Sequence, residues 1–252
     1  MRRVEIYGLR IDREIIPGDN IAEVIVMASK TNGIEILNGD IIVVSSKVIA
    51  KSENRIISLD TVEPSKEAIE IANITNKDPR LVELILRESK EVLKIERNNI
   101  IVLTKHGIVC ANAGIDQSNT GGTGRVILLP VNPDVSAKRI REYINKVLGI
   151  NVAIIVSDTY GRPFREGQVN FAIGFSGICP YRDYRGQSDR DGYILRVKNI
   201  AIVDEIAAAA ELVMGQSTEN TPFAIVRGVE YNICEESGFN DVAMPKERWL
   251  FR

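Results

Sequence analysis

Two aspartates lie in sequence contexts that suit chemistry. Asp158 follows an apolar segment, residues 154–156, and precedes Thr159 and a stretch rich in turn-forming residues. Asp116 follows a second apolar segment and lies in the polar stretch of residues 112–119. Apolar runs rich in Ile and Val predict buried strands, and ligands of open α/β sheets bind beyond the carboxyl ends of strands. We therefore expect both acids at a functional site. The alternative for Asp158 and Thr159 is that they only cap a turn.

The scarcity of histidine limits the kind of metal that these acids could bind. The chain has one histidine, His106, in a segment that predicts a surface hairpin turn. Its three cysteines, Cys110, Cys179 and Cys234, are odd in number and far apart, so we expect reduced core residues and no disulfide framework. Without a histidine cluster a zinc site is disfavoured. Carboxylate, hydroxyl and amide oxygens instead suit Mg²⁺ or Mn²⁺.

Four basic residues accompany the acids. Lys47 and Lys51 follow a predicted strand, and in an extended chain residues at this spacing share one face, where both can reach one polyphosphate. Arg162 and Arg165 belong to a different loop and suit forked binding of a carboxylate or phosphate on a second substrate. Together these groups fit phosphoryl transfer, in which catalysis is mostly positioning and charge neutralisation. The alternative is that Lys47 and Lys51 are ordinary solvated charges.

The elements that must position these residues mix helices and strands. Helices are predicted from about residue 21, over 65–72, over 78–86, from Ser136 to Gly149 and over 202–214, with strands at 4–7, 41–44, 100–103, 108–110, 126–129, 154–156 and 223–226. The order over residues 126–156 is a local βαβ signature. The pattern predicts a mixed α/β (α+β) fold. We expect one domain over residues 1–252, with two interleaved subdomains and a more irregular antiparallel lobe around 165–200. The glycine-rich residues 120–125 have neither P-loop nor Rossmann spacing.

Composition narrows the class of protein. The 252 residues are 44% hydrophobic and carry a formal net charge of −2, which predicts a globular chain with a substantial core. Balanced charge argues against nucleic acid as a partner. The sequence contains neither a leader-like apolar segment at its amino terminus nor a run long enough to span a membrane. We therefore expect a cytoplasmic protein without a membrane partner.

Four motifs, taken together and in order, resemble the coenzyme F-420-0:gamma-glutamyl ligase family of archaea. They are SSKVIAKSE at residues 45–53, NAGIDQSN at 112–119, DTYGRPFR at 158–165 and VDEIA at 203–207. The resemblance extends over nearly the whole chain. It implies a homodimeric ligase that uses GTP to add L-glutamate to the terminal carboxylate of a deazaflavin precursor, with a second, gamma-linked glutamate commonly following. It also implies dependence on Mg²⁺ or Mn²⁺ at two sites, with K⁺ as a further activator.

The resemblance also implies roles for individual residues. Asp116, Asp158, Thr159 and Gln216 resemble metal ligands, and we expect Asp116, Asp158 and Arg165 to serve catalysis. The positions that resemble nucleotide contacts are Leu9, Arg10, Ile11, Ser46, Lys47, Lys51, Asn119, Met214, Gly215, Gln216, Ser217, Thr218, Glu219, Asn220 and Thr221. Gln216 departs from the glutamate of some relatives. Its amide oxygen can still coordinate a hard cation, but it brings no charge, so we expect weaker binding of the second metal.

The implied reaction needs no protein nucleophile, because the substrate carboxylate attacks the γ-phosphate of GTP to form an acyl phosphate. The glutamate amine then displaces phosphate. This agrees with a chain that offers no Ser-His or Cys-His arrangement. Two alternatives remain open: a metal-dependent phosphohydrolase that activates water with the same acids, and a non-catalytic nucleotide-binding module.

Overall fold

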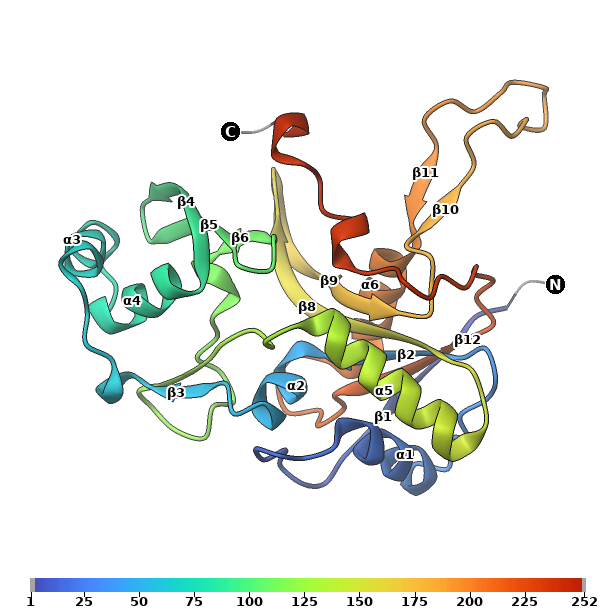
Figure 1. Ribbon diagram of the computed structural model, residues 1–252, viewed down its shortest axis with the longest axis horizontal. Helices are drawn as coiled ribbons and strands as arrows, with labels where there is room; N and C mark the ends of the chain where they lie inside the picture. Colours follow the sequence, from blue (N-terminus) through green and yellow to red (C-terminus); the bar gives the residue numbers. More distant parts are fainter. Residues whose placement is uncertain (1–2, 251–252) are drawn as a thin grey trace.

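The chain is organised around a five-stranded mixed sheet in the order β1-β12-β2-β8-β9 (Figure 1). The computed structural model describes residues 3–250. The strands are β1 (Glu5–Leu9), β2 (Ile41–Ser45), β8 (Ala153–Arg162), β9 (Arg165–Ser176) and β12 (Phe223–Arg227). Only β2 and β8 pair in parallel; every other pair in this sheet is antiparallel. The predicted mixed α/β class is confirmed.

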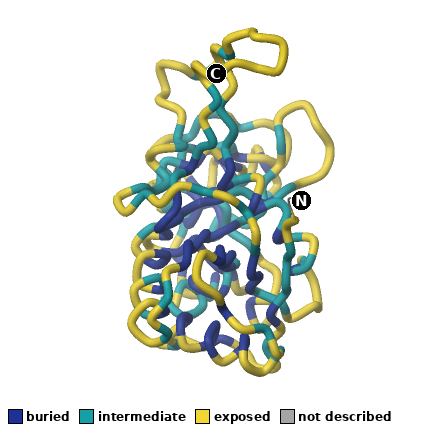
Figure 2. The backbone as a smooth tube through the Cα atoms, turned by 90° about the vertical axis from the view of Figure 1, so that its right-hand side faces the viewer, coloured by how far each residue is buried: buried dark blue, intermediate teal, exposed yellow. Residues whose placement is uncertain are grey.

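Helices cover both faces of this sheet. Helices α1 (Ile21–Thr31), α2 (Ser46–Ser52) and α5 (Pro133–Leu148) pack on the face formed by Ile42 and Val44, and α6 (Ile202–Met214) packs on the face of Ile41 and Val43. These four residues of β2 are fully buried, which explains why the strand is an unbroken apolar run. Burial of each such side chain stabilises the fold by about 1.5–3 kcal/mol. Figure 2 shows the resulting concentration of buried chain in the body of the molecule.

A second unit, residues 55–129, is inserted between α2 and α5 and has its own core. It contains β3 (Ile56–Ser58), the 3-10 turn η1 (Leu59–Thr61), α3 (Lys66–Thr75), α4 (Pro79–Arg87), β4 (Ser89–Glu96), β5 (Asn99–Thr104), β6 (Val109–Ala111), the 3-10 turn η2 (Asn112–Gly114) and β7 (Arg125–Ile127). Figure 1 shows it as a lobe beside the central sheet. Arg55 anchors it at the junction, because its guanidinium donates to the Leu129 carbonyl at 3.0 Å and pairs with Glu88.

An extended arm and a tail complete the chain. Strands β10 (Tyr181–Asp183) and β11 (Asn199–Ala201) form the base of the arm, which projects from the body in Figure 1. After β12, residues 228–250 form two 3-10 turns, η3 (Phe239–Asp241) and η4 (Lys246–Arg248). The irregular antiparallel lobe predicted around 165–200 therefore begins later than predicted, because β9 continues the central sheet to Ser176.

Three local predictions were wrong. Helix α5 begins at Pro133 rather than Ser136, because the Asn132 side chain accepts a hydrogen bond from Val135 and proline suits the first helical position. β7 pairs with β3 and not with β8, so the helix does not complete a βαβ unit there. Lys47 and Lys51 lie on α2 rather than on an extended chain. One helical turn separates them, so they still share a face.

The prediction that all three cysteines are reduced was also wrong. Cys179 and Cys234 form a disulfide, because the tail returns beside the end of β9, where the Cys179 amide donates to the Asn232 carbonyl at 2.8 Å. Cys110 is free and buried, as predicted. His106 lies in the predicted turn but is half-buried, with Nε2 2.8 Å from the Pro130 carbonyl, so it is not a free surface residue. Within residues 3–250, no helix is long and apolar enough to cross a membrane.

Candidate active site

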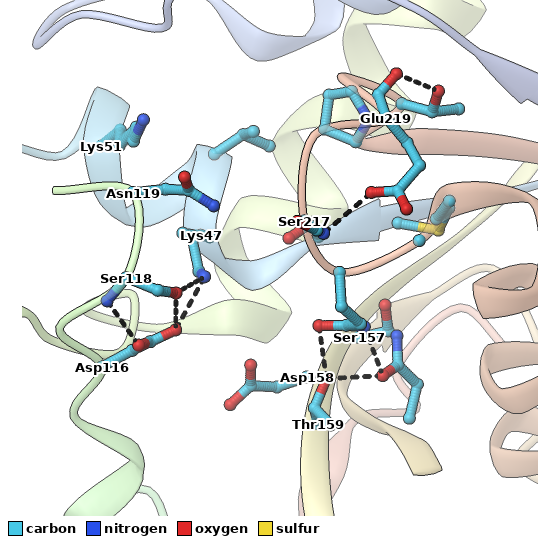
Figure 3. Close-up of a pocket in the computed structure, with 18 of the residues that line it drawn as sticks. Lys47, Lys51, Asp116, Ser118, Asn119, Ser157, Asp158, Thr159, Ser217 and Glu219 are labelled. Carbon is cyan, nitrogen blue, oxygen red and sulfur yellow. Dashed lines mark hydrogen bonds and ion pairs between the residues drawn. The ribbon is translucent and has the colours of Figure 1, made fainter. Parts of the chain in front are cut away.

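The predicted acids meet at one cavity of about 760 Å³ between the central sheet and the inserted unit. Figure 3 shows Asp116 on one side of it and Asp158 on the other. Predicted contact residues that line the cavity are Ile11, Lys47, Lys51, Asp116, Asn119, Asp158, Thr159, Met214, Gly215, Gln216, Ser217, Glu219, Asn220 and Thr221. Ser46 lies behind this wall and reaches Asp158 through a hydrogen bond. The structure therefore brings together segments more than 100 residues apart in sequence.

The end of β2 explains why Asp158 faces the cavity. Strand β8 does not stop at Asp158, as its sequence context indicates, but continues to Arg162 in pairing with β9. Its pairing with β2 ends at Ser157, where the chain of β2 turns into α2. Asp158 is thus the first residue of β8 beyond its pairing with β2. Alternation places it on the face of Val156, whereas Thr159 points to the opposite face.

Asp158 is a partly buried carboxylate with little compensation. The Ser46 hydroxyl donates to its Oδ1 at 2.9 Å, and no salt bridge to it is found within residues 3–250. Burial raises the pKa of Asp158 to about 6, and the Ser46 hydrogen bond only partly opposes that rise. Burial and the nearby Asp158 charge likewise raise the pKa of Cys110 to about 12, so this thiol stays protonated and is a poor nucleophile.

The negative charge of Asp116, unlike that of Asp158, is compensated by a lysine and by hydrogen-bond donors. Lys47 Nζ lies 2.7 Å from its Oδ2, and the Ser118 amide and hydroxyl donate to its two carboxylate oxygens at 2.7 and 2.8 Å. Burial by itself would raise the pKa of Asp116, but Lys47 and the Ser118 amide outweigh it and lower that pKa. Paired backbone hydrogen bonds between Asp116 and Ile127 fix the loop.

A third polar cluster joins the sheet to the loop after α6. The Thr159 hydroxyl donates to Asn170 Oδ1 at 2.7 Å and lies 3.2 Å from Gln216 Oε1, while Gln216 Nε2 donates to Asn170 Oδ1 at 3.3 Å. Asn170 pairs with Thr159 in the β8–β9 register and is only 4% exposed. The sequence analysis missed it. The available signal was a polar residue within the apolar alternation of β9.

The loop after α6 and Lys51 form the remaining wall. Gly215 adopts φ +69°, and a Cβ there would lie 2.3 Å from Glu219, so the turn requires glycine. The Glu219 carboxylate accepts a hydrogen bond from the Ser217 amide at 2.8 Å, which closes the loop on itself. Lys51 pairs with Glu14 at 2.9 Å, and its side chain is only 12% exposed. It is therefore not an ordinary solvated charge.

Several predicted residues do not line the cavity. Leu9 is fully buried in the core, Arg10 pairs with Asp12 in solvent, and Thr218 is exposed beside the cavity. Arg165 is exposed near the tip of the β8–β9 hairpin, and the guanidinium of Arg162 donates to the Glu166 carbonyl. The predicted roles of these residues remain predictions.

The donor set suits a hard cation. Within residues 3–250 no group of three or more His, Cys, Asp or Glu side chains could hold a metal. A divalent ion would therefore need neutral oxygens beside Asp116 and Asp158, and Thr159 and Gln216 offer them at the same cavity. Burial raises the pKa of Asp158, and the Lys47 charge opposes that rise only in part, so a bound cation would compensate this carboxylate further.

The chain is similar to known proteins over most of its length. The model of the F420-0:Gamma-glutamyl ligase family matches residues 8–228. A Methanothermobacter thermautotrophicus protein named coenzyme F420:L-glutamate ligase is 44% identical over 236 residues, which are 93% of either chain. Proteins with the same name from Methanocaldococcus jannaschii and Methanopyrus kandleri are 43% and 44% identical, over 100% and 90% of this chain and 98% and 88% of their own. The chain belongs to the F420-0:gamma-glutamyl ligase family.

Proposed function

We propose that the protein is a GTP-dependent ligase that forms an amide between L-glutamate and the terminal carboxylate of the deazaflavin precursor F-420-0. The observation that carries this proposal is a single cavity that brings Asp116 and Asp158 together with Lys47 and Lys51. The names of the relatives supply the substrates. A second, gamma-linked glutamate, a homodimer and activation by K⁺ are further parts of the proposal, which rest on family membership.

The reaction follows two balanced steps. A carboxylate oxygen of the acceptor attacks the γ-phosphorus of GTP, the bond to the β,γ-bridging oxygen breaks, and GDP leaves. The glutamate amine then attacks the acyl carbon, phosphate departs with the carbon–oxygen electron pair, and the amine loses a proton. Negative charge is concentrated on the reacting oxygens in the transition states of both steps, so positioned positive groups provide most of the catalysis.

The chain's own residues supply the positioning. Lys51, held at the cavity wall, suits the nucleotide phosphates, and Lys47 can exchange Asp116 for a phosphate oxygen. Asp116, Asp158, Thr159 and Gln216 would hold Mg²⁺ or Mn²⁺. When bound, these ions neutralise phosphate charge. Arg165, exposed near the tip of the β8–β9 hairpin, is assigned to the acidic end of the acceptor.

Product analysis tests the proposal. The protein is incubated with GTP and Mn²⁺, with and without F-420-0 and L-glutamate, and the products are separated by mass spectrometry. A ligase forms GDP, phosphate and an acceptor heavier by one or two glutamate residues, and only when both other substrates are present. Rapid GTP hydrolysis without them would support the phosphohydrolase instead. Nucleotide binding without turnover in any mixture would support a non-catalytic module.

A further inference from the structure

Asn170 occupies a central place in the cavity that the reaction itself does not explain. It lies on β9 opposite Thr159, lines the cavity and is only 4% exposed. Burying an amide is costly unless its donors and acceptors are satisfied. Its hydrogen bonds therefore show what the surrounding cluster can bind.

Asn170 Oδ1 accepts a hydrogen bond from each of two neighbouring side chains, Thr159 and Gln216. Thr159 has one hydroxyl proton, and the shorter contact, 2.7 Å, assigns it to Asn170 Oδ1. Gln216 gives an amide hydrogen to the same oxygen at 3.3 Å. Thr159 Oγ1 and Gln216 Oε1 are then two acceptors 3.2 Å apart that cannot both be satisfied by that one proton. Two adjacent acceptors with no shared donor suit a cation.

The side-chain nitrogen of Asn170, Nδ2, is a hydrogen-bond donor that points to a different kind of ligand. No hydrogen-bond partner of Nδ2 is found within residues 3–250, although the residue is more than nine-tenths buried against the cavity. Its amide group holds two hydrogens, so it can donate to an oxygen in the cavity. The cluster thus presents acceptors for a cation and, beside them, a donor for an anionic oxygen. A metal-bound phosphate has both kinds of group.

We propose that Asn170 is a positioning residue that turns Thr159 and Gln216 toward a divalent cation and donates through Nδ2 to a phosphate oxygen next to it. This inference rests on the proposed function. Residues that orient metal ligands typically contribute about 10–100-fold to metal affinity. If Asn170 instead had a purely structural role and only joined β9 to the loop after α6, a substitution there would change the affinities for cation and anion alike.

Two substitutions separate these possibilities. Asn170→Leu removes both the acceptor and the donor, so Mn²⁺ affinity should fall about 10-fold or more. Asn170→Asp keeps an oxygen for Thr159 and Gln216 but replaces the donor with a second anionic oxygen. Mn²⁺ should then bind at least as tightly as to the natural protein, whereas inorganic phosphate should bind about 10-fold more weakly. Gln168→Leu is the matched control, since Gln168 lines the same cavity two residues away and is exposed.

The full chain is titrated with Mn²⁺ alone, followed by the electron paramagnetic resonance of the free ion, and the Mn²⁺-saturated protein is titrated with inorganic phosphate by calorimetry. Thermal unfolding checks that each variant is folded, and Asn170→Asp alone decides the question if Asn170→Leu unfolds. The proposal is overturned if Asn170→Asp weakens both ligands equally or neither, or if a folded Asn170→Leu binds Mn²⁺ normally. Natural protein that binds both ions but forms no amide would contradict the proposed function instead and leave the role of Asn170 standing.

Discussion

The two aspartates of the cavity have opposite electrostatic surroundings. Asp116, from the inserted unit, is paired with Lys47 and Ser118, and its pKa is lowered. Asp158, from the central sheet, has a hydroxyl partner and a pKa raised to about 6. The first carboxylate already has a cation in the form of a lysine, and the second does not. The sheet side of the cavity therefore has the greater need for a bound metal.

This difference also bears on the two units of the fold. Lys47 lies on α2 of the main body, and Asp116 belongs to the inserted unit, so their ion pair bridges the cavity. A nucleotide that binds Lys47 competes with Asp116 for it. Once released, Asp116 becomes available to a cation. Ligand binding and metal binding at Asp116 should therefore support each other.

Asp158→Asn is the change with the largest expected effect. It removes the charge of a predicted metal ligand while leaving an oxygen that can accept the Ser46 hydrogen bond, so ligation should be abolished while the fold stays intact. Initial rates at saturating Mn²⁺ measure this, with circular dichroism as the check on folding. Asp60→Asn, in an exposed ion pair of the inserted unit, is the control and should keep full activity. Normal ligation by Asp158→Asn would exclude this residue from the site.

The same substitution should change how stability depends on pH. The folded state raises the pKa of Asp158 from 3.8 to about 6, so this group favours folding below pH 3.8 and that contribution is lost as the pH rises through 6. Above pH 6 the buried charge destabilises the metal-free protein. Asp158→Asn should therefore gain about 2–3 kcal/mol of unfolding free energy relative to the natural protein between pH 4 and pH 8.

Asp116→Asn provides the comparison of opposite sign. The folded state lowers the pKa of Asp116, so its contribution to stability is present above pH 3.8 and is lost as the pH falls below it. This variant should lose stability at pH 8 relative to pH 4. Urea unfolding of both variants without metal, at several pH values, measures the two slopes. If the change in unfolding free energy caused by each substitution varied with pH in the same direction, the two acids would not be electrostatically distinct.

The basic residues extend the comparison to the substrates. Lys51 is largely buried at the cavity wall, whereas Arg165 is exposed outside it. Lys51→Ala should raise the KM for GTP by an amount equivalent to about 2 kcal/mol, as loss of a buried charged hydrogen bond does. Arg165→Ala should change chiefly the KM for the deazaflavin substrate, and by less, because exposed charges contribute under about 1 kcal/mol. Both KM values are measured for both variants. An unaltered KM for GTP in Lys51→Ala would remove Lys51 from the phosphate site.

Elements with local signals were predicted well from the sequence. Helix α6 begins and ends where predicted, because its apolar face stops at Gly215. Helix α1 follows the predicted cap, since the Asn20 side chain accepts from Ala22. The end of β8 was misplaced because the Asp-Thr pair resembles a turn, while pairing with β9 carries the strand to Arg162. The disulfide depends on a tail that returns across the fold, which no local pattern records.

The site was predictable to a similar degree. Asp116 and Asp158 lie in two of the four motifs, and both line the cavity. Asn170 was missed because its importance comes from the register that places it opposite Thr159. A buried polar residue in a strand has no meaning until its partners across the sheet are known.

Gln216→Glu should have a small effect, and it tests whether a second negative charge near Asp158 strengthens metal binding. Gln216 offers a neutral oxygen 3.2 Å from Oγ1 of Thr159, the residue that follows Asp158 on β8. A glutamate would add a negative charge to a hard-cation site, so Mn²⁺ should bind more tightly, by about 1 kcal/mol or roughly fivefold, as for a partly solvated charge pair.

The glutamate would also lose the hydrogen that Gln216 Nε2 gives to Asn170, and this loss opposes part of the gain. The measurement is the Mn²⁺ concentration that gives half-maximal ligation, together with direct Mn²⁺ binding. Glu211→Gln, on α6 before the loop, is the control for a general change in charge and should leave the titration unchanged. Identical Mn²⁺ titrations for Gln216→Glu and the natural protein would place the second cation away from Gln216.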